Sequence, residues 1–545
     1  MSARRNPLGR DLRAAWYASP LYRLTLSGAA PEAPTARPVD ILPGDPARGA
    51  QLVDGQFSFA GEEVHAPGAS IWQSPGGGPA WQDEFESFSW LRDLRARANA
   101  PARGRARELV ESWLARHRNP DPHAWRPDRM GQRLTAWLTQ AEFLLKDAEA
   151  EFAKTFMSGL ARQARHLANT VGRAPDGARK LAAIRGLIDS GLCLPQGEKR
   201  AEQGLRLLDV ELGRQVLNDG GHIERCPSTQ LRVLRDLVEL RQTLLALHRA
   251  PSAALLGTID RMAPLLRTFR HGDGRLALFH GGVEEENWLI DLVLTQSEAK
   301  GRPLAAAPHS GFQWIQAGRA LVLADVGAPP VAGGRGHAGT LSFEMSLGKE
   351  RLIVNCGAYL GRNGEWREAV RATAAHSTLA VDERNSAELI EGGGIGRGPR
   401  QVSAERKGTE GSAWIEASHD GYLPSAGVVH HRRLYVGADG TDLRGEDRLV
   451  RGGGRGKGEH RFAVRFHLHP DVQSSLVKDG SAVLLRLKSG AGWQMLAAGG
   501  RLSLTESVYL GVPGQRRRTE QIVVDGPIEG DESVVKWAFH RIPEG

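Results

Sequence analysis

The sequence predicts a multidomain α+β protein in which a helical region precedes an antiparallel β-sandwich. Between residues 81 and 270, apolar side chains recur at the spacing of amphipathic helices. From about residue 305 the pattern changes to short alternating segments near ten residues apart, separated by turn residues. The chain has 545 residues, which is enough for two or three domains that each bury a core.

Residues 1–80 are irregular, rich in Pro and Gly, and we expect them to wrap the domain that follows. A helical domain is predicted over residues 81–300 and a β-sandwich over residues 301–545, with the stretch GRPLAAAPHSG as the linker.

Short loops with Pro or Gly join the predicted helices, so neighbouring helices should run antiparallel. A solenoid, a bundle and a closed α/α toroid all satisfy this pattern. The sequence has no fixed period, which disfavours a family of regular repeats. The predicted helices cover residues 81–96, 106–117, 131–147, 151–170, 177–190, 198–217, 228–248 and 253–270.

The predicted strands alternate apolar and polar residues, as in a sheet with one buried face. They cover residues 319–327, 339–348, 350–357, 376–383, 413–422, 428–437, 442–450, 460–470, 481–490, 493–500, 501–510 and 520–526.

Two glycine-rich tracts superficially suggest nucleotide-binding loops. Residues 392–398 do not satisfy GxGxxG, and no helical pattern follows them. Residues 451–458 lack the leading Gly of a P-loop and have Gly458 where Ser or Thr is needed. We therefore predict that both are hairpin loops.

The net charge is +8, which favours an anionic partner such as an acidic polymer, nucleic acid or a membrane surface. The alternative is a mild excess spread over the surface. The three cysteines are far apart, so neither a disulfide framework nor a zinc ribbon is expected.

The first 20 residues lack the apolar run of a signal peptide, and no stretch approaches 18 consecutive apolar residues. We therefore expect no membrane span and a cytoplasmic location, with the periplasm as the alternative.

The first candidate site is the loop after the helix that ends near Leu217. It presents Asn218, His222, Glu224 and Arg225, polar side chains placed to meet a ligand at the end of a helical domain. The alternative is a capping loop whose His bonds backbone.

A second candidate follows the next helix end and contains His271, Asp273 and His280 among glycines. Because both loops follow helix ends, they could share one rim. An ordinary Asp-Gly turn is the alternative.

The third candidate is the segment of residues 355–389. Arg367 and Arg371 are four residues apart, so a short helix would place both on one face, where they could pair with a carboxylate. His376 then begins a strand and could move a proton near neutral pH. A salt-bridged surface loop with a core-edge His is the alternative.

A fourth candidate is a metal site. His467 and His469 should face one side of a strand, and with Asp382 they could hold a structural zinc. No cofactor is required by any other motif, and neither HExxH nor GxSxG occurs.

Several strings, which together extend over essentially the whole chain, are typical of one known family. They are WYASPLYRLTL, FSWLRDLRA, LNDGGHIERCPS, DRMAPLLRTFRHGDGRLALF, VRFHLHPDV and, most specifically, VNCGA with RATAAHSTL. In these strings the chain resembles the heparinase II/III family of polysaccharide lyases.

The resemblance implies an incomplete α/α toroid, an antiparallel β-sandwich and β-elimination of uronic-acid polysaccharides. It assigns the toroid His or Asn to His222 and the sandwich His to His376. The family's toroid Tyr has no counterpart, because no Tyr lies between residues 81 and 300; His271 or Tyr359 is the replacement acid that we consider.

We thus expect a lyase for anionic glycans such as glycosaminoglycans or alginate, with His222 and Arg371 neutralising the uronate and His376 as base or charge stabiliser. Substrate binding is expected from Asn218, Glu224, Arg225, Arg367 and Arg371. The alternative from another class is a noncatalytic acidic-glycan-binding or assembly protein with the same fold. Nucleic acid is disfavoured as a partner.

Overall fold

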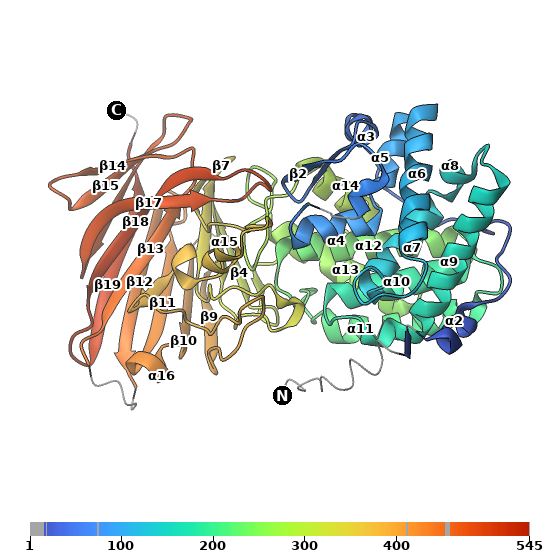
Figure 1. Cartoon of the computed structure of the whole chain (residues 1–545). Helices are drawn as coiled ribbons and strands as arrows, with labels where there is room; N and C mark the ends of the chain where they lie inside the picture. Colours follow the sequence, from blue (N-terminus) through green and yellow to red (C-terminus); the bar gives the residue numbers. More distant parts are fainter. Residues whose placement is uncertain (1–15, 18, 73–75, 410–411, 453–457, 544–545) are drawn as a thin grey trace. The chain divides into compact units, whose positions relative to one another are not determined.

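The structure, a computed structural model, describes residues 16–17, 19–72, 76–409, 412–452 and 458–543. Tertiary contacts divide the chain into two compact units. Unit 1 comprises residues 1–214, 235–256 and 360–362, and unit 2 comprises residues 215–234, 257–359 and 363–545. The longer helices lie in the blue-to-green part of the chain, and the two large sheets lie mainly in its yellow-to-red part (Figure 1).

Unit 1 is built from helices and a two-stranded sheet, and several of its helices begin at a proline, whose fixed φ suits the first turn. Its elements are α2 (Pro20–Leu26), α3 (Pro46–Val53), β1 (Gln56–Phe59), β2 (Glu62–His65), α4 (Pro79–Ser87), α5 (Leu91–Arg97), α6 (Ala100–Arg116), α7 (Pro127–Thr139), α8 (Ala141–Leu145), α9 (Ala150–Thr170), α10 (Ala178–Cys193) and α11 (Glu198–Gln215).

Three further helices complete the helical region: α12 (Pro227–Ala246), α13 (Ala253–Thr268) and α14 (Asn287–Ser297). Each predicted helix range contains a helix, but the range 81–96 is split because Phe88 adopts a left-handed conformation with φ 57°. That break lets Phe88 pack edge-on against Trp113 and Trp137 in the aromatic core. The helix α14 was not predicted from the sequence.

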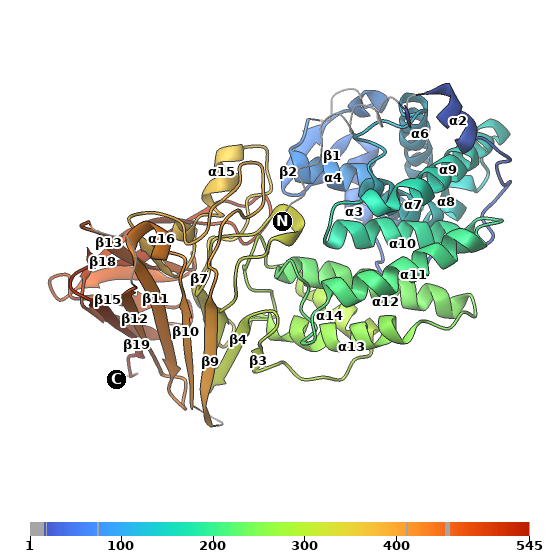
Figure 2. The same cartoon turned by 90° about the horizontal axis from the view of Figure 1, so that it is seen from below.

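Unit 2 contains two antiparallel sheets. One has the strand order β14-β15-β16-β19-β12-β11-β10-β9, and the other has β17-β18-β13-β7-β6-β5-β4-β3 with β8 paired to β13. Both views show β9, β10 and β11 side by side, as the pairing requires (Figures 1 and 2).

The strands are β3 (Ala306–Ala307), β4 (Phe312–Ala317), β5 (Ala320–Asp325), β6 (Phe343–Leu347), β7 (Glu350–Val354), β8 (Leu379–Val381), β9 (Val402–Thr409), β10 (Ser412–His419), β11 (Val428–Val436), β12 (Asp442–Arg451), β13 (Arg461–Leu468), β14 (Gln473–Val477), β15 (Ala482–Arg486), β16 (Gly492–Ala498), β17 (Arg501–Tyr509), β18 (Arg517–Pro527) and β19 (Glu532–Arg541).

The predicted strands are all present, while β3, β4, β9, β14 and β19 were missed. Strands β9 and β14 lie at the ends of their sheet and carry many exposed polar residues, so their alternation is weak. The predicted hairpin at residues 451–458 lies largely outside the described residues. Within the described part of the chain, no helix is long and apolar enough to cross a membrane.

A buried charge network joins the two sheets inside the apolar core. Arg432 of β11 donates to both carboxylate oxygens of Asp447, at 2.8 and 3.0 Å. It also donates to the carbonyls of Leu341 and Ser377, each at 2.9 Å, next to the other sheet. His430 donates to Asp447 at 2.7 Å, and together these partners hold the pKa of Asp447 below its ordinary value despite burial.

We predict that Asp447→Ala destabilises the protein by about 3–5 kcal/mol, because Arg432 would remain buried without its counter-charge and His430 without its hydrogen-bond acceptor. Urea unfolding followed by circular dichroism measures this loss. Asp531→Ala is the matched control, since Asp531 is exposed, and it should leave the unfolding midpoint nearly unchanged. Equal midpoints for the two variants would contradict this role of Asp447.

Candidate functional site

The centre of the candidate site is the buried carboxylate of Asp325 at the end of β5, which is 1% exposed. It pairs with the guanidinium of Arg225, and its second oxygen accepts a hydrogen bond from His280 Nε2 at 2.8 Å. Burial opposes ionisation, but Arg225 and His280 hold the pKa of Asp325 below its ordinary value. Asp325 therefore carries a fixed negative charge inside unit 2.

Arg225 is committed to the protein itself. Its Nε donates to the Ser310 carbonyl at 2.6 Å, and its terminal nitrogens donate to Ala328 at 2.6 Å and Gly311 at 3.0 Å. Its guanidinium also lies 4.8 Å from the centre of the Phe312 ring. The prediction that Arg225 binds substrate is therefore corrected: its donors tie the loop after α11 to the β3–β5 segment.

Two members of this cluster have strained backbones. Arg225 has φ 52° and His280 has φ 48°, in the left-handed region that residues with a Cβ seldom adopt. Such strain is retained where surrounding interactions fix it, and here both side chains pair with Asp325. The two loops predicted to share a rim do meet, since Arg225 Nη1 lies 3.2 Å from His280 Nε2.

The hydrogen bonds fix the tautomers of three histidines. A carbonyl can only accept, so the 2.8 Å contact with Ala372 places a proton on His376 Nδ1. His376 Nε2 is then an acceptor and takes a hydrogen bond from His337 Nδ1 at 3.1 Å. The backbone N–H of His337 donates to His280 Nδ1 at 3.4 Å, which leaves the His280 proton on Nε2, facing Asp325.

This arrangement leaves the lone pair of His337 Nε2 without a hydrogen-bond partner among the described residues. Burial lowers the pKa of His337 well below its ordinary value, and the charge of Arg371 adds to that effect. Burial also lowers the pKa of His376 to about 4. Both rings are therefore neutral near pH 7, and His337 Nε2 is the ring nitrogen that can accept a proton.

His337 and Asp325 were not predicted from the sequence. Asp325 ends an apolar strand segment, and His337 stands alone in a glycine-rich loop, so neither belongs to a recognisable motif. A strand end followed by turn residues was the one available signal for Asp325.

His222 lies in the same loop as Arg225 but has its own partners. Its Nε2 donates to Gln215 Oε1 at 3.1 Å, and its Nδ1 accepts from the Glu224 backbone N–H at 3.2 Å. Burial lowers the pKa of His222 to about 4. Both ring nitrogens are thus occupied, so the predicted contact of His222 with a uronate requires displacement of Gln215.

Arg371 uses four of its five N–H donors within the protein. Its side chain donates to the carbonyls of Gly336 at 3.1 Å, Ile390 at 3.2 Å and Gly394, and it pairs with Glu368 at 2.7 Å. The helix α15 (Gly364–Ala369) ends before Arg371, so Arg367 and Arg371 do not share a helical face as predicted. Arg371 instead links the loop that contains Gly336 to the loop that contains Ile390 and Gly394.

The remaining predicted residues have partners of their own or are exposed. His271 is enclosed, with Ser346 at 3.0 Å and Glu344 at 2.9 Å, so its prediction as the acid has no geometric support. Tyr359 is half-buried with its ring 6.2 Å from Trp366. Asn218 is exposed, and Glu224 is buried and accepts from Thr229 at 3.2 Å.

The predicted zinc ligands do not come together. Asp382 accepts from the Arg461 backbone N–H at 2.9 Å, at the first residue of β13, whereas His467 lies near the last. Six residues of extended strand separate these ends by roughly 20 Å. No group of three or more His, Cys, Asp or Glu in the described ranges is placed to hold a metal.

Comparison with known proteins identifies the family. Residues 104–252 match the heparinase II/III N-terminus, and residues 299–538 match the heparinase II/III-like C-terminal domain. The chain belongs to the heparinase II/III-like family. It is also 32% identical over 543 residues to FtsZ-localized protein C of Caulobacter vibrioides, covering 96% of this chain and 93% of that protein.

Solved structures of family lyases share the fold. Heparinase III superposes with a TM-score of 0.72 at 13% identity, covering 96% of this chain and 89% of that one. The heparan sulfate lyase HepC of Pedobacter heparinus gives a TM-score of 0.60 at 15% identity, covering 98% and 88%. The predicted order of an α/α toroid followed by a β-sandwich is thereby confirmed.

We predict that Asp325→Asn lowers stability by about 3–5 kcal/mol. The substitution removes the counter-charge of buried Arg225, and it weakens the pairings that hold the strained backbones of Arg225 and His280 in place. Thermal and urea unfolding measure the effect. Asp420→Asn, at a partly exposed turn of the same unit, serves as the control. A small effect at Asp325, similar to that at Asp420, would show that the carboxylate does not organise the cluster.

The buried histidines also predict acid sensitivity. An unfolded His takes up a proton below its ordinary pKa of 6.5, whereas His222 and His376 stay neutral in the folded state down to about 4. Stability should therefore fall as pH falls from about 6.5 to about 4, by up to about 1.4 kcal/mol per pKa unit and histidine.

Urea unfolding at pH values across this window tests that dependence. His376→Gln should flatten the decline because it removes one proton uptake on unfolding, whereas His309→Gln, at an exposed position, should leave the slope unchanged. The same slope in all three proteins would contradict the assignment to His376.

Proposed function

We propose that this chain is a lyase that cleaves uronic-acid-containing glycans by β-elimination, with His337 as the proton-transfer group and His376 as the residue that positions it. The observation that supports this proposal is the uncommitted lone pair of His337 Nε2, oriented by the bond from His337 Nδ1 to His376. The family relationship supplies the class of reaction, and the net charge of +8 favours an anionic substrate.

In the proposed step, His337 Nε2 accepts the C5 proton of a uronate. The C5–H electron pair forms the C4–C5 double bond while the C4–O bond breaks, and the departing oxygen takes a proton. His337 can return the proton that it has accepted, so one group can serve as base and then as acid. His376 is a positioning residue, because it fixes the tautomer of His337 through Nδ1.

We predict that incubation with heparin, alginate, hyaluronan or chondroitin produces a rise in absorbance near 232 nm from the unsaturated uronate. His337→Ala should lower the rate by roughly 10²–10⁴-fold because the proton acceptor is lost. His376→Ala should also slow the reaction and should shift its pH profile, because the tautomer of His337 would no longer be fixed. His309→Ala is the matched exposed control.

The absence of any rise across this panel would contradict the lyase proposal. Activity that survives in His337→Ala but is lost in His376→Ala would instead restore His376 as the base.

A second candidate function is noncatalytic assembly on the same scaffold. It is supported by the relative named FtsZ-localized protein C, and by the absence of any Tyr between residues 81 and 300. His376 and His222 also have both ring nitrogens bonded within the protein.

Fluorescent fusions in the host cell distinguish the two candidates. If assembly is the function, the wild-type protein and a His337→Ala, His376→Ala double variant should both co-localise with FtsZ, without glycan cleavage. Diffuse fluorescence of the wild-type fusion would contradict the assembly function.

A further inference from the structure

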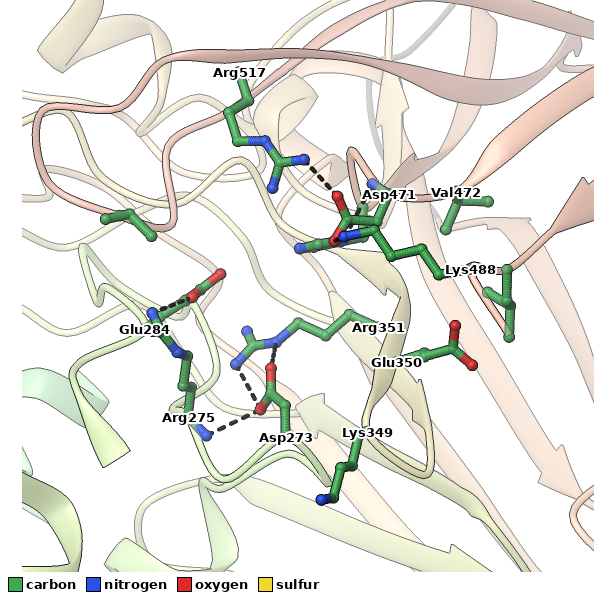
Figure 3. Close-up of a pocket in the computed structure, with 13 residues that line it drawn as sticks. Asp273, Arg275, Glu284, Lys349, Glu350, Arg351, Asp471, Val472, Lys488 and Arg517 are labelled. Carbon is green, nitrogen blue, oxygen red and sulfur yellow. Dashed lines mark hydrogen bonds and ion pairs between the residues drawn. The ribbon is translucent and has the colours of Figure 1, made fainter. Parts of the chain in front are cut away.

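A cavity of about 370 Å³ lies within unit 2, apart from the histidine cluster. Its walls come from five parts of the chain: Asp273, Arg275 and Glu284 after α13, residues 349–351 at the start of β7, residues 469–472 after β13, residues 487–488 after β15, and Val512 with Arg517 before and at the start of β18. Figure 3 shows the ion pairs of Asp471 with Arg517 and Lys488 on one side of the cavity, and the pairs Arg351–Asp273 and Arg275–Glu284 on the other.

The aspartates of this cavity already have cationic partners. Asp273 accepts from Arg351 Nε at 2.8 Å and from its Nη2 at 3.2 Å. Asp471 pairs with Lys488 at 2.8 Å and with Arg517 at 2.5 Å. These partners hold the pKa of Asp471 to about 2 against the effect of burial, so it stays charged.

The two glutamates are also engaged. Glu284 pairs with Arg275 at 2.9 Å and accepts a hydrogen bond from the Tyr509 hydroxyl. Glu350 accepts from the Ser489 backbone N–H at 2.8 Å. Every carboxylate of the cavity therefore has a donor, and each keeps further lone pairs that can accept from hydroxyl groups.

The cations exceed the anions. Five lysine and arginine side chains line the cavity against four carboxylates. Lys349 is exposed and has no ion-pair partner among the described residues, and the side chains of Lys488 and Arg517 are 69% and 41% exposed. Burial lowers the pKa of His469 to about 4, so that ring adds no charge at neutral pH. The cavity therefore carries a positive surplus that solvent can reach.

We infer that this cavity binds an acidic saccharide of one or two sugar residues. Its volume is near the lower end of ligand-binding pockets, about 300–1,000 Å³. Paired carboxylates and guanidiniums suit a ligand with many hydroxyl groups, while the surplus cation calls for one acidic group. Val472 and Leu487 offer apolar contact for C–H groups of the sugar.

This inference shares the acidic-glycan part of the proposed function but none of its residues. Elimination at His337 and binding in the cavity are separate events, so each can be present without the other.

Isothermal titration of the full chain with D-glucuronate tests the inference. D-glucose, acetate and inorganic phosphate serve as comparison ligands. We expect glucuronate to bind more tightly than all three, because only it combines a carboxylate with a ring of hydroxyls. Lys349→Gln and Arg517→Gln should each raise the dissociation constant about ten-fold, the effect of losing one charge-assisted hydrogen bond.

Lys300→Gln, at an exposed position of the same unit outside the cavity, should bind glucuronate like the wild type. Glucuronate binding that persists in His337→Ala supports the inference even if no glycan is cleaved. Equal affinity for glucose, acetate or phosphate, unchanged affinity in both cavity variants, or no binding of glucuronate would overturn it.

Discussion

The geometry of the candidate site depends on one buried charge, the carboxylate of Asp325. A lone carboxylate in a protein interior would lose far more hydration energy than folding can supply, so it must recruit partners. It recruits Arg225 and His280, which come from loops after two different helices and adopt left-handed backbone conformations. The position of His337 follows from the same charge, because its backbone N–H is held by His280.

Arg225 and Arg371 donate most of their hydrogen bonds to backbone carbonyls of the protein itself. Loop segments outside the sheets leave carbonyl oxygens without ladder partners, and a guanidinium has five donors in a fixed plane. Arg225 accordingly bonds three carbonyls and Arg371 another three. An arginine near a candidate site is therefore not necessarily a substrate-binding residue. Its N–H donors that are already bonded within the protein must be counted before it is assigned that role.

The sequence predicted the larger features because they repeat along the chain. Helical spacing and strand alternation persist over many residues, so the order of the helical and β regions and most element positions could be predicted. The polar segments around His222, His280 and His376 were also recognisable by their density. Asp325 and His337 were not, because each is a single residue whose importance arises from burial and from partners distant in sequence.

Predicting the chemistry of a histidine requires knowing the acceptor at its other nitrogen. His376 matches the family motif, yet the Ala372 carbonyl fixes its proton on Nδ1 and His337 occupies Nε2. The family resemblance therefore points to His376, although both of its ring nitrogens are already bonded within the protein. The ring nitrogen without a hydrogen-bond partner among the described residues is Nε2 of the neighbouring His337. A chain without a toroid Tyr can still transfer protons if this one nitrogen serves both halves of the reaction, since the proton removed from carbon is the one that the departing oxygen needs.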